Sequence, residues 1–278
     1  MLGLFSAVTL AGANTFVKAS KDILAGRSVM TLTSAVLALP FAFIVPLPNA
    51  ATWAVLAMSI PAHWIYQVAL VRALSRGDLS LVFPVMRGSA PLLTALAAAI
   101  FLHEQLTTLA LLGLFIASLA TLIFALPEKS FGGSHKVRNS ALMWAGLTGA
   151  MVAVYNVIDA RGTRTAPNPF SFTVWLFLTD WIGVNTVTFF TRGRKAYTDM
   201  LRSTWRTGVG AGTLSLFSFG AALYGFSIAP VAYISAMRET AVVFAALMGW
   251  FFLREGFGAR RTLAAVVLAG GLSLLQFG

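Results

Sequence analysis

The sequence consists of long apolar runs separated by short connections that contain proline, glycine or charged residues. Ten of these runs are long enough to cross a bilayer as a helix, which takes about 20 residues. Alternating short strands are absent from the pattern, and a backbone inside hydrocarbon must be paired within helices or closed barrels. We therefore expect helices. The predicted transmembrane helices are residues 2–19, 27–46, 52–74, 79–102, 107–126, 140–160, 170–190, 206–228, 231–253 and 260–277.

The composition agrees with a membrane location. Hydrophobic residues make up 58% of the 278 residues and charged residues only 10%, whereas soluble domains carry about 25% charged residues. The charged side chains are too few to cover a soluble protein of this size, and the chain contains no cysteine. The composition thus excludes a soluble enzyme, a disulfide-stapled secreted domain and a disordered chain. It predicts a multi-pass protein of the cell (inner) membrane, in contact with the lipid bilayer.

The sequence contains an internal repeat. Residues 82–104 align without a gap with residues 233–255, at a constant offset of 151 (233 minus 82). Apolar matches are common in such a composition, so the charged matches carry the evidence. These charged matches are Arg87 with Arg238 and Glu104 with Glu255. We expect the two glutamates to bind the N–H groups that open the fifth and tenth helices.

The repeat predicts the topology. Each half contains five helices, an odd number, so the second half enters the membrane from the opposite side. The predicted fold class is an all-α integral membrane protein with ten transmembrane helices in two inverted five-helix repeats. The first repeat is assigned to residues 1–128, the linker to 129–138 and the second repeat to 139–278. Gly270 and Gly271 are expected to permit close contact between the fifth and tenth helices.

The basic residues indicate the orientation. The net charge is +11, but Lys and Arg lie between the apolar runs rather than in one stripe, which argues against nucleic-acid binding. Of the 20 Lys and Arg residues, sixteen fall on one side of the predicted membrane and two on the other. The positive-inside rule places the crowded side in the cytoplasm and both termini outside.

Inverted repeats are typical of secondary transporters, in which the substrate site lies near the bilayer midplane between the repeats. The two halves can exchange conformations, so that one state opens inward and its mirror opens outward. A symmetric membrane scaffold is the alternative. The sequence shows no nucleophile–base pair, phosphate loop or metal cluster, so we expect neither an enzyme nor a cofactor.

Three motifs in the first half and their counterparts in the second carry a resemblance to a known family. They are Ala73-Leu74-Ser75-Arg76-Gly77-Asp78-Leu79, Pro84-Val85-Met86-Arg87 and Leu102-His103-Glu104, then Ala229-Pro230-Val231-Ala232, Met237-Arg238 and Leu253-Arg254-Glu255. The chain resembles the EamA-type transporters of the drug/metabolite transporter superfamily over essentially its whole length. This resemblance implies export or exchange of small metabolites, commonly amino acids, through a cavity lined by helices 1–4 and 6–9. It also implies cytoplasmic termini, so both orientations stay open.

Arg87 and Arg238 are the main candidates for substrate binding. A charge at the bilayer centre costs about 2.5–3.5 kcal/mol, so each arginine is expected to face a cavity or a partner. Inverted repeats would bring both into one cavity, where they would bind a carboxylate or another anionic group. The alternative is a structural arginine bound by helix-end carbonyl groups.

Three acidic residues are candidates for proton coupling. Glu239 follows Arg238, but adjacent helical residues do not face each other, so no pair between them is expected. Asp180 lies at the middle of the seventh helix, where a partner arginine is the alternative explanation. Asp159 lies near a helix end that we expect water to reach, which favours a structural role. The remaining candidates for substrate contact are Asn14, His63, Gln67, Tyr155, Asn156 and Tyr233.

Some of these polar residues also have a packing explanation. A single histidine such as His63 more often makes a hydrogen bond between helices than it relays protons, and both explanations stay open. Ser215 and Ser218 occupy the matching positions in the eighth helix, and we expect them to bridge helices.

Together these patterns predict a secondary active or facilitative transporter, an exporter or exchanger, that moves a small polar metabolite by alternating access. The arginines favour an amino acid, another zwitterion or an organic anion as the substrate. The alternative is a proton-coupled exporter of cationic drugs or lipophilic compounds, which the acidic and aromatic residues favour. The expected partners are the substrate, the bilayer and protons. No nucleic acid is expected, and the protein is expected to be a monomer or a homodimer.

Overall fold

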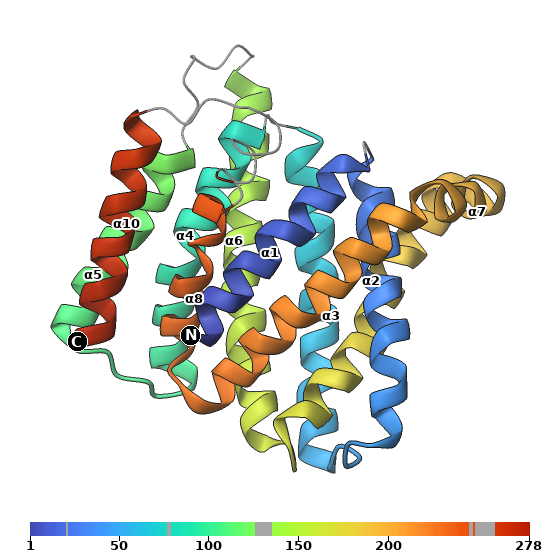
Figure 1. Ribbon diagram of the computed structural model, residues 1–278, viewed down its shortest axis with the longest axis horizontal. Coiled ribbons are helices and arrows are strands. Elements are labelled where there is room, and N and C mark those ends of the chain that lie inside the picture. Colours follow the sequence, from blue (N-terminus) through green and yellow to red (C-terminus); the bar gives the residue numbers. More distant parts are fainter. Residues whose placement is uncertain (21, 77–78, 126–134, 245–246, 248–258) are drawn as a thin grey trace. The chain divides into compact units, whose positions relative to one another are not determined.

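The computed structural model describes residues 1–20, 22–76, 79–125, 135–244, 247 and 259–278 (Figure 1). All regular secondary structure in these ranges is helical, as expected for an all-α membrane protein. The elements are α1 (Leu2–Ala19), α2 (Ile23–Ala38), the 3-10 helix η1 (Leu39–Phe43), α3 (Ala50–Leu74), α4 (Leu79–Phe101), α5 (Thr108–Ala125), α6 (His135–Thr165), α7 (Pro169–Ile228), α8 (Val231–Arg238) and α10 (Ala259–Phe277).

Apolar length and surface both fit a bilayer. Among the described residues, four stretches are long and apolar enough to span a membrane: Ile23–Phe43, Ala50–Ala73, Asn139–Thr165 and Pro169–Ile228. Many large apolar side chains are exposed in the isolated chain, and Phe190 among them is 80% exposed. A water-soluble protein rarely exposes so many of them together, so these surfaces are expected to contact lipid.

Most observed helices begin and end within a few residues of the predicted ones. α2 starts at Ile23, earlier than predicted, because Asp22 caps it: the Asp22 side chain accepts a hydrogen bond from the N–H of Ala25 at 3.1 Å. This satisfies an N–H group that has no partner within the helix. α6 begins at His135, inside the predicted linker, and residues 129–134 lie outside the described residues.

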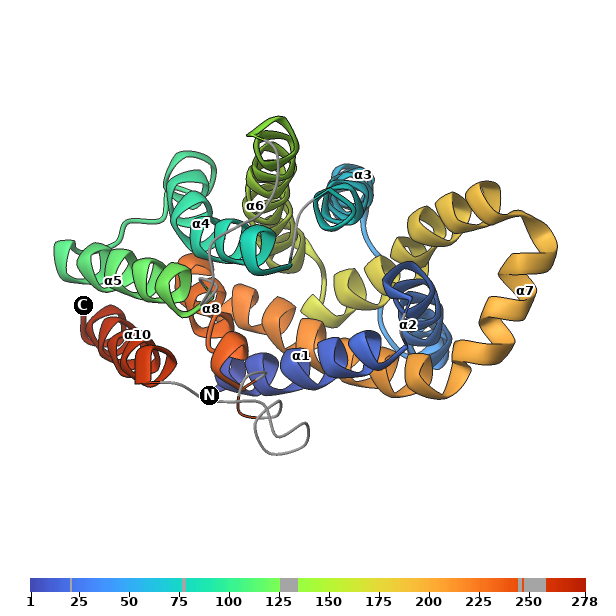
Figure 2. The same ribbon diagram turned by 90° about the horizontal axis from the view of Figure 1, so that it is seen from above.

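The predicted seventh and eighth helices, 170–190 and 206–228, form one element, α7. Helical backbone angles are interrupted at Gly193, where φ is 78° and ψ is 164°. This conformation is accessible to glycine but strained for residues with a Cβ. Residues 191–205, which were expected to connect the two helices, are thus helical on both sides of Gly193. Figure 2 shows α7 turning back on itself, and we call the segment around Gly193 the α7 bend.

The predicted ninth helix, 231–253, is interrupted after Arg238. Glu239 and Thr240 form a turn, and residues 241–244 are helical again. The N–H groups of both turn residues donate to carbonyl oxygens three residues earlier, at 3.0 and 3.2 Å, which is the spacing of a 3-10 helix. Most of the remaining predicted helix lies outside the described residues.

The chain divides into two compact units. Unit 1 consists of Met1–Trp64 and Ile158–Ile228, and unit 2 of Ile65–Val157 and Ala229–Gly278. Each unit therefore takes segments from both predicted repeats, and α3 and α6 contribute to both units. The division into two inverted repeats stays a prediction.

In unit 1, α7 packs closely against α1 and α2. The hydroxyl groups of Ser6 and Ser218 each donate to the other residue's carbonyl oxygen at 2.7 Å. Ser34 on α2 donates to the carbonyl oxygen of Gly212 at 2.9 Å. A Cβ on Gly212 would lie 2.6 Å from the carbonyl oxygen of Met30, so this approach requires glycine. The prediction that Ser218 bridges helices is confirmed.

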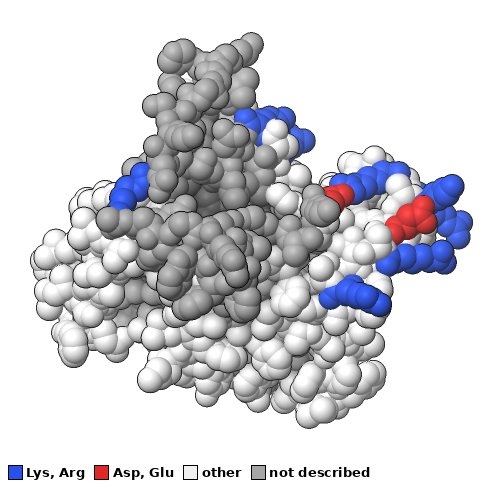
Figure 3. All heavy atoms as spheres, turned by 45° about the horizontal axis from the view of Figure 1, so that its top comes forward, with Lys and Arg blue, Asp and Glu red and all other residues white. Residues whose placement is uncertain are grey.

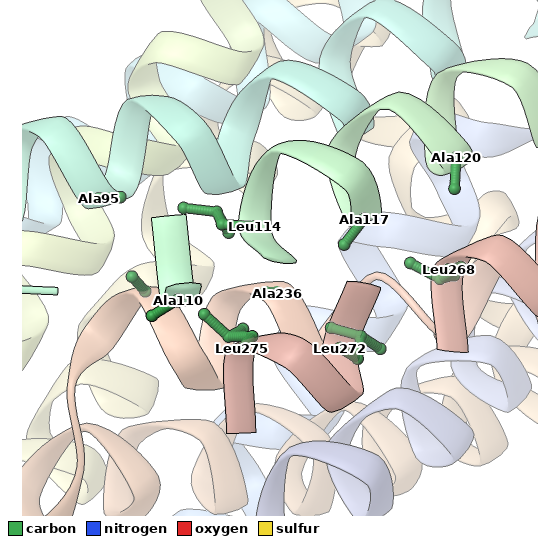
Figure 4. Packing of buried hydrophobic residues seen from close by; sticks show 10 residues of the cluster. Ala95, Ala110, Leu114, Ala117, Ala120, Ala236, Leu268, Leu272 and Leu275 are labelled. Carbon is green, nitrogen blue, oxygen red and sulfur yellow. The ribbon is translucent and has the colours of Figure 1, made fainter. Parts of the chain in front are cut away.

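In unit 2, α5 and α10 meet at backbone distance. A Cβ on Gly113 would lie 2.5 Å from Leu275 N, and a Cβ on Gly271 would lie 2.7 Å from Ala117 N. The prediction of a glycine-mediated contact is confirmed for Gly271. Figure 4 shows the apolar cluster that continues this contact. Its buried residues are Ala95, Ala110, Leu114, Ala117, Ala120, Ala232, Ala236, Leu268, Leu272 and Leu275.

Glu104 does not cap α5, so that prediction was wrong. Glu104 Oε2 accepts a hydrogen bond from the N–H of Val231, the first residue of α8, at 2.9 Å. The first turn of α5 is capped by Thr107, whose Oγ1 accepts from the N–H of Ala110 at 3.1 Å. A hydroxyl group directly before a helix is a strong capping group, which leaves the carboxylate for α8. The repeated glutamate, Glu255, lies outside the described residues.

Candidate functional site

Arg87 and Glu239 form an ion pair inside unit 2. Arg87 belongs to α4 and Glu239 to the turn after α8, and Arg87 Nη1 lies 3.4 Å from Glu239 Oε1. The two side chains are only 16% and 5% exposed. A buried charge is tolerated when it is paired, and removing its partner is costly. The partner of Glu239 was not predicted, because the two residues are 152 positions apart in the sequence.

Arg238, Tyr66 and Tyr155 complete this polar group. Both tyrosines lie near the guanidinium groups of Arg87 and Arg238. Their rings pack edge to face with centroids 5.3 Å apart. The group thus combines two guanidinium groups, one carboxylate and two phenols. We call Arg87, Arg238, Glu239, Tyr66 and Tyr155 the arginine cluster.

Asn156 follows Tyr155 on α6 and is 1% exposed. Its Nδ2 lies 3.3 Å from Thr94 Oγ1 and 3.4 Å from Ser235 Oγ. In the part of the chain that the structure describes, Asn156 Oδ1 and Glu239 Oε2 have no hydrogen-bond donor within reach. Buried acceptors are normally satisfied, so these two oxygens could accept hydrogen bonds from a ligand.

Unit 1 contains a separate polar group on α3 and α6. Asp159 Oδ2 lies 2.9 Å from His63 Nε2, and Asp159 Oδ1 accepts a hydrogen bond from Ser59 Oγ. Asp159 and Ser59 are 0% exposed and His63 is 6% exposed. The expectation that water reaches Asp159 at a helix end is therefore wrong in this conformation, because neighbouring helices enclose the side chain.

The structure distributes the predicted site residues between the two units. Unit 2 holds Arg87, Arg238, Glu239, Gln67, Tyr155, Asn156 and Tyr233, and unit 1 holds Asn14, His63, Asp159 and Asp180. Gln67 is buried on α3. Tyr233 packs against the apolar cluster between α5 and α10, whereas Asn14 and Asp180 are partly buried on α1 and α7. The arginine cluster therefore brings together only part of the predicted set.

Ser59, Thr94 and Ser235 were not predicted. Two of them had a signal in the sequence. Ser59 precedes His63 by four residues and Ser235 precedes Glu239 by four residues, a spacing that places each pair on one helix face. Thr94 had no such signal, because hydroxyl residues are common in apolar helices and usually bond to their own backbone.

Basic side chains gather around the α7 bend, where Figure 3 shows several of them close together. One of them, Arg192, binds Asp22 at the start of α2, with Arg192 Nη2 3.0 Å from Asp22 Oδ1. This hydrogen bond from Arg192 lowers the pKa of Asp22 below its ordinary value of 3.8. The exposed basic residues of the α7 bend, within residues 191–206, are Arg192, Arg194, Lys195, Arg202 and Arg206.

Apolar helices that carry buried, paired charges are typical of membrane transport proteins. The EamA-like transporter family model matches residues 139–277, half of the chain. The chain belongs to the EamA-like transporter family, whose members transport metabolites or drugs across membranes and are not enzymes.

Two further comparisons bear on this assignment. No curated protein matches the sequence. A solved structure titled "Crystal structure of protein" has a similar fold, with a TM-score of 0.80 and 15% sequence identity. The match covers 99% of this chain and 97% of the other chain. At this identity the likeness concerns the fold and carries no information on the substrate.

Proposed function

We propose that this protein is an alternating-access transporter whose small polar substrate binds at the arginine cluster. The supporting observation is the buried Arg87–Glu239 pair beside Arg238. With both arginines and the glutamate ionised, the three side chains carry one net positive charge, which a ligand carboxylate would neutralise. Glu239 Oε2 offers an acceptor for an ammonium group. An amino acid or another zwitterion supplies both groups, whereas an organic anion supplies only the carboxylate.

The proposed transport route depends on the repeat. Residues 1–128 and 139–278 would form two inverted five-helix repeats, joined by the linker 129–138, that exchange conformations between inward-open and outward-open states. The proposed location is the cell (inner) membrane, with the protein a monomer or a homodimer. The basic side chains around the α7 bend favour a cytoplasmic position for that bend.

Other polar residues have proposed roles in the same cycle. Protons are the proposed coupling ions, and their candidate carriers are Glu239, Asp180 and Asp159. The proposed additional substrate contacts are Asn14, His63, Gln67, Tyr155, Asn156 and Tyr233. Among these, Tyr155 and Asn156 have the strongest support, because Tyr155 belongs to the arginine cluster and Asn156 has an acceptor oxygen available.

A second candidate substrate class consists of cationic or lipophilic compounds. The observation that favours it is the Tyr66–Tyr155 ring pair in the same cluster as Glu239. Aromatic faces and a carboxylate together attract organic cations. The two arginines of the cluster oppose this class, because their charge repels a cation.

Transport assays in proteoliposomes test the proposal. Three labelled probes would be compared: a mixture of L-amino acids, succinate and tetraphenylphosphonium. We expect saturable uptake of the amino acids and its loss in Arg87→Ala. The matched control is Arg202→Ala, which removes an exposed arginine and should leave uptake unchanged. Saturable uptake of tetraphenylphosphonium alone would favour the second class, and wild-type uptake by Arg87→Ala would contradict the arginine assignment.

A further inference from the structure

We infer that His63 and Asp159 jointly bind the proton that drives transport, with Ser59 orienting the carboxylate. This inference deepens the proposed transport function and rests on it. It places the proton-binding site of the transport cycle in unit 1. The three residues of this site, Ser59, His63 and Asp159, are not part of the arginine cluster.

Each of the two carboxylate oxygens of Asp159 has a hydrogen-bond partner on α3. Ser59 and His63 are four residues apart on α3, so their side chains leave the same face of the helix. Ser59 donates to Asp159 Oδ1, and His63 Nε2 lies 2.9 Å from Asp159 Oδ2. The imidazole and the carboxylate are therefore within direct proton-transfer distance of each other.

The charge of the pair changes when a single proton is lost. With one shared proton, His63 and Asp159 are together neutral, either as imidazolium and carboxylate or as two neutral groups. Without that proton a negative charge remains on Asp159, which is 0% exposed. An unpaired buried charge is costly to the folded protein. The proton belongs to the pair rather than to either residue.

The described neighbours of the pair include a hydroxyl group and two aromatic rings. Among the described residues, the hydrogen-bond partners of Asp159 are only Ser59 and His63. From α7, Phe219 packs edge to face on the His63 ring with centroids 5.5 Å apart. Phe177 packs in turn on Phe219, with centroids 6.2 Å apart. Neither aromatic residue carries a charge.

Helices α6 and α7 carry further charged residues within unit 1. On α6, Arg164 donates its Nε to the carbonyl oxygen of Phe226 at 2.8 Å, and Arg161 is exposed. On α7, Asp180 follows Phe177 by three residues and is partly buried. On α3, within unit 1, His63 is the titratable residue.

The contrast with Glu239 explains why coupling is assigned to the unit 1 pair. Glu239 interacts with the guanidinium groups of Arg87 and Arg238, and these groups stay positively charged at all physiological pH values. A guanidinium group cannot accept a proton from Glu239, whereas the imidazole of His63 can share one with Asp159 at 2.9 Å. Because Asp159 is 0% exposed, exchange of this proton with water requires a conformational change that admits water. The proton then passes to water on one side of the membrane and is regained from water on the other.

Infrared difference spectroscopy tests proton binding without any substrate. Spectra of the protein in lipid would be recorded after pH changes between about pH 5 and about pH 8, the range in which histidine titrates. We expect signals from a carboxyl group and an imidazole that titrate together. Asp159→Asn should remove the carboxyl signal and His63→Gln the imidazole signal, and each variant should shift the pH midpoint of the signal that remains. Unchanged signals in Asp159→Asn would overturn the inference.

Transport measurements test coupling. The probe is the labelled L-amino acid mixture, assayed in two ways: uptake driven by a pH gradient, and counterflow exchange without a gradient. In Asp159→Asn and His63→Gln, we expect the stimulation by the gradient to fall to onefold, whereas counterflow in Asp159→Asn stays within twofold of wild type. Stimulation at the wild-type level in either variant would overturn the inference.

Two controls separate the possible failures. Asp199→Asn makes the same chemical change at an exposed position of unit 1 and should retain the gradient response. Ser59→Ala should weaken the response without removing it, because the proton-binding groups remain. If wild-type protein shows no counterflow, the proposed amino-acid transport has failed, and the infrared titration alone decides whether the pair binds a proton. Variants that do not purify as folded protein would be replaced by Asp159→Glu, which must restore the titrating carboxyl signal.

Discussion

Arg87 and Glu239 are 152 positions apart in the sequence, yet Arg87 Nη1 lies 3.4 Å from Glu239 Oε1. The repeat places Gly88 at the position equivalent to Glu239 (239 minus 151). A Cβ on Gly88 would lie 2.4 Å from Leu122 Cγ, so the packing disfavours a larger side chain there. The arginine therefore occurs in both halves but the acid in only one, and the two halves differ chemically at the candidate site.

Breaking this ion pair should destabilise the protein. Arg87→Gln and Glu239→Gln each remove one charge of this buried ion pair, at a cost of up to about 3–5 kcal/mol. The double variant should lose less stability than the sum of the two single variants, by about 0.5–3 kcal/mol. Thermal or chemical unfolding of the four proteins in the same detergent measures this difference. Strictly additive losses would show that the two residues do not interact.

The contact between α5 and α10 should not tolerate even one methyl group at Gly271. A Cβ there would lie 2.7 Å from Ala117 N, so Gly271→Ala should cost about 1–3 kcal/mol through overpacking. The adjacent Gly270→Ala is the matched control, since a Cβ at this position meets no described atom within 4 Å. Because alanine is the better helix former, the control should gain up to about 1 kcal/mol. Unfolding temperatures of both variants check the expected opposite signs.

The Asp22–Arg192 pair should make stability depend on acidity. The pKa of Asp22 is lowered in the folded protein, mainly by the hydrogen bond from Arg192. The stabilisation is therefore fully present above the ordinary value of 3.8 and is lost as the pH falls through the lower folded pKa. Both side chains are partly exposed, so the contribution should be about 1 kcal/mol or less.

The measurement for this pair compares unfolding temperatures between about pH 2 and about pH 6. Asp22→Asn should flatten part of the acid-induced decrease seen in wild type. Asp199→Asn, which changes an exposed aspartate on α7, serves as the control and should follow the wild-type curve. An Asp22→Asn curve parallel to wild type would contradict the assignment.

The α7 bend should require glycine at position 193. Its φ of 78° and ψ of 164° strain any residue with a Cβ, so Gly193→Ala should cost about 1–3 kcal/mol. Gly220→Ala, within the same element and in open space, should instead be neutral or stabilising. Limited proteolysis and thermal unfolding would compare the two variants. Equal behaviour of the two would mean that the bend does not depend on the glycine conformation.

The helix positions could largely be predicted from the sequence, because a bilayer requires a long apolar run for each span. The departures have local causes. The α7 bend depends on the backbone angles of Gly193, and the interruption of the ninth helix falls at Glu239 and Thr240, where neither proline nor glycine marks it. Such breaks depend on tertiary packing, which a hydrophobic pattern does not report.

The candidate site was predictable only as a set of residue types. Rare charged residues inside apolar runs identified Arg87, Arg238 and Glu239, because burying a charge is costly and needs a reason. Their pairing was not predictable, and neither was the meeting of His63 with Asp159, since both pairs join distant parts of the chain. Partners of this kind follow from the packing of helices rather than from spacing along one helix.

The reciprocal hydrogen bonds between Ser6 and Ser218 limit how α1 and α7 can move. Translation of one helix along the other would separate both hydroxyl–carbonyl pairs at once, whereas a small rotation about this crossing point would leave both intact. We therefore expect α1 and α7 to pivot about this crossing point during the transport cycle. Their mutual tilt would change, and their register along the helix axes would stay the same.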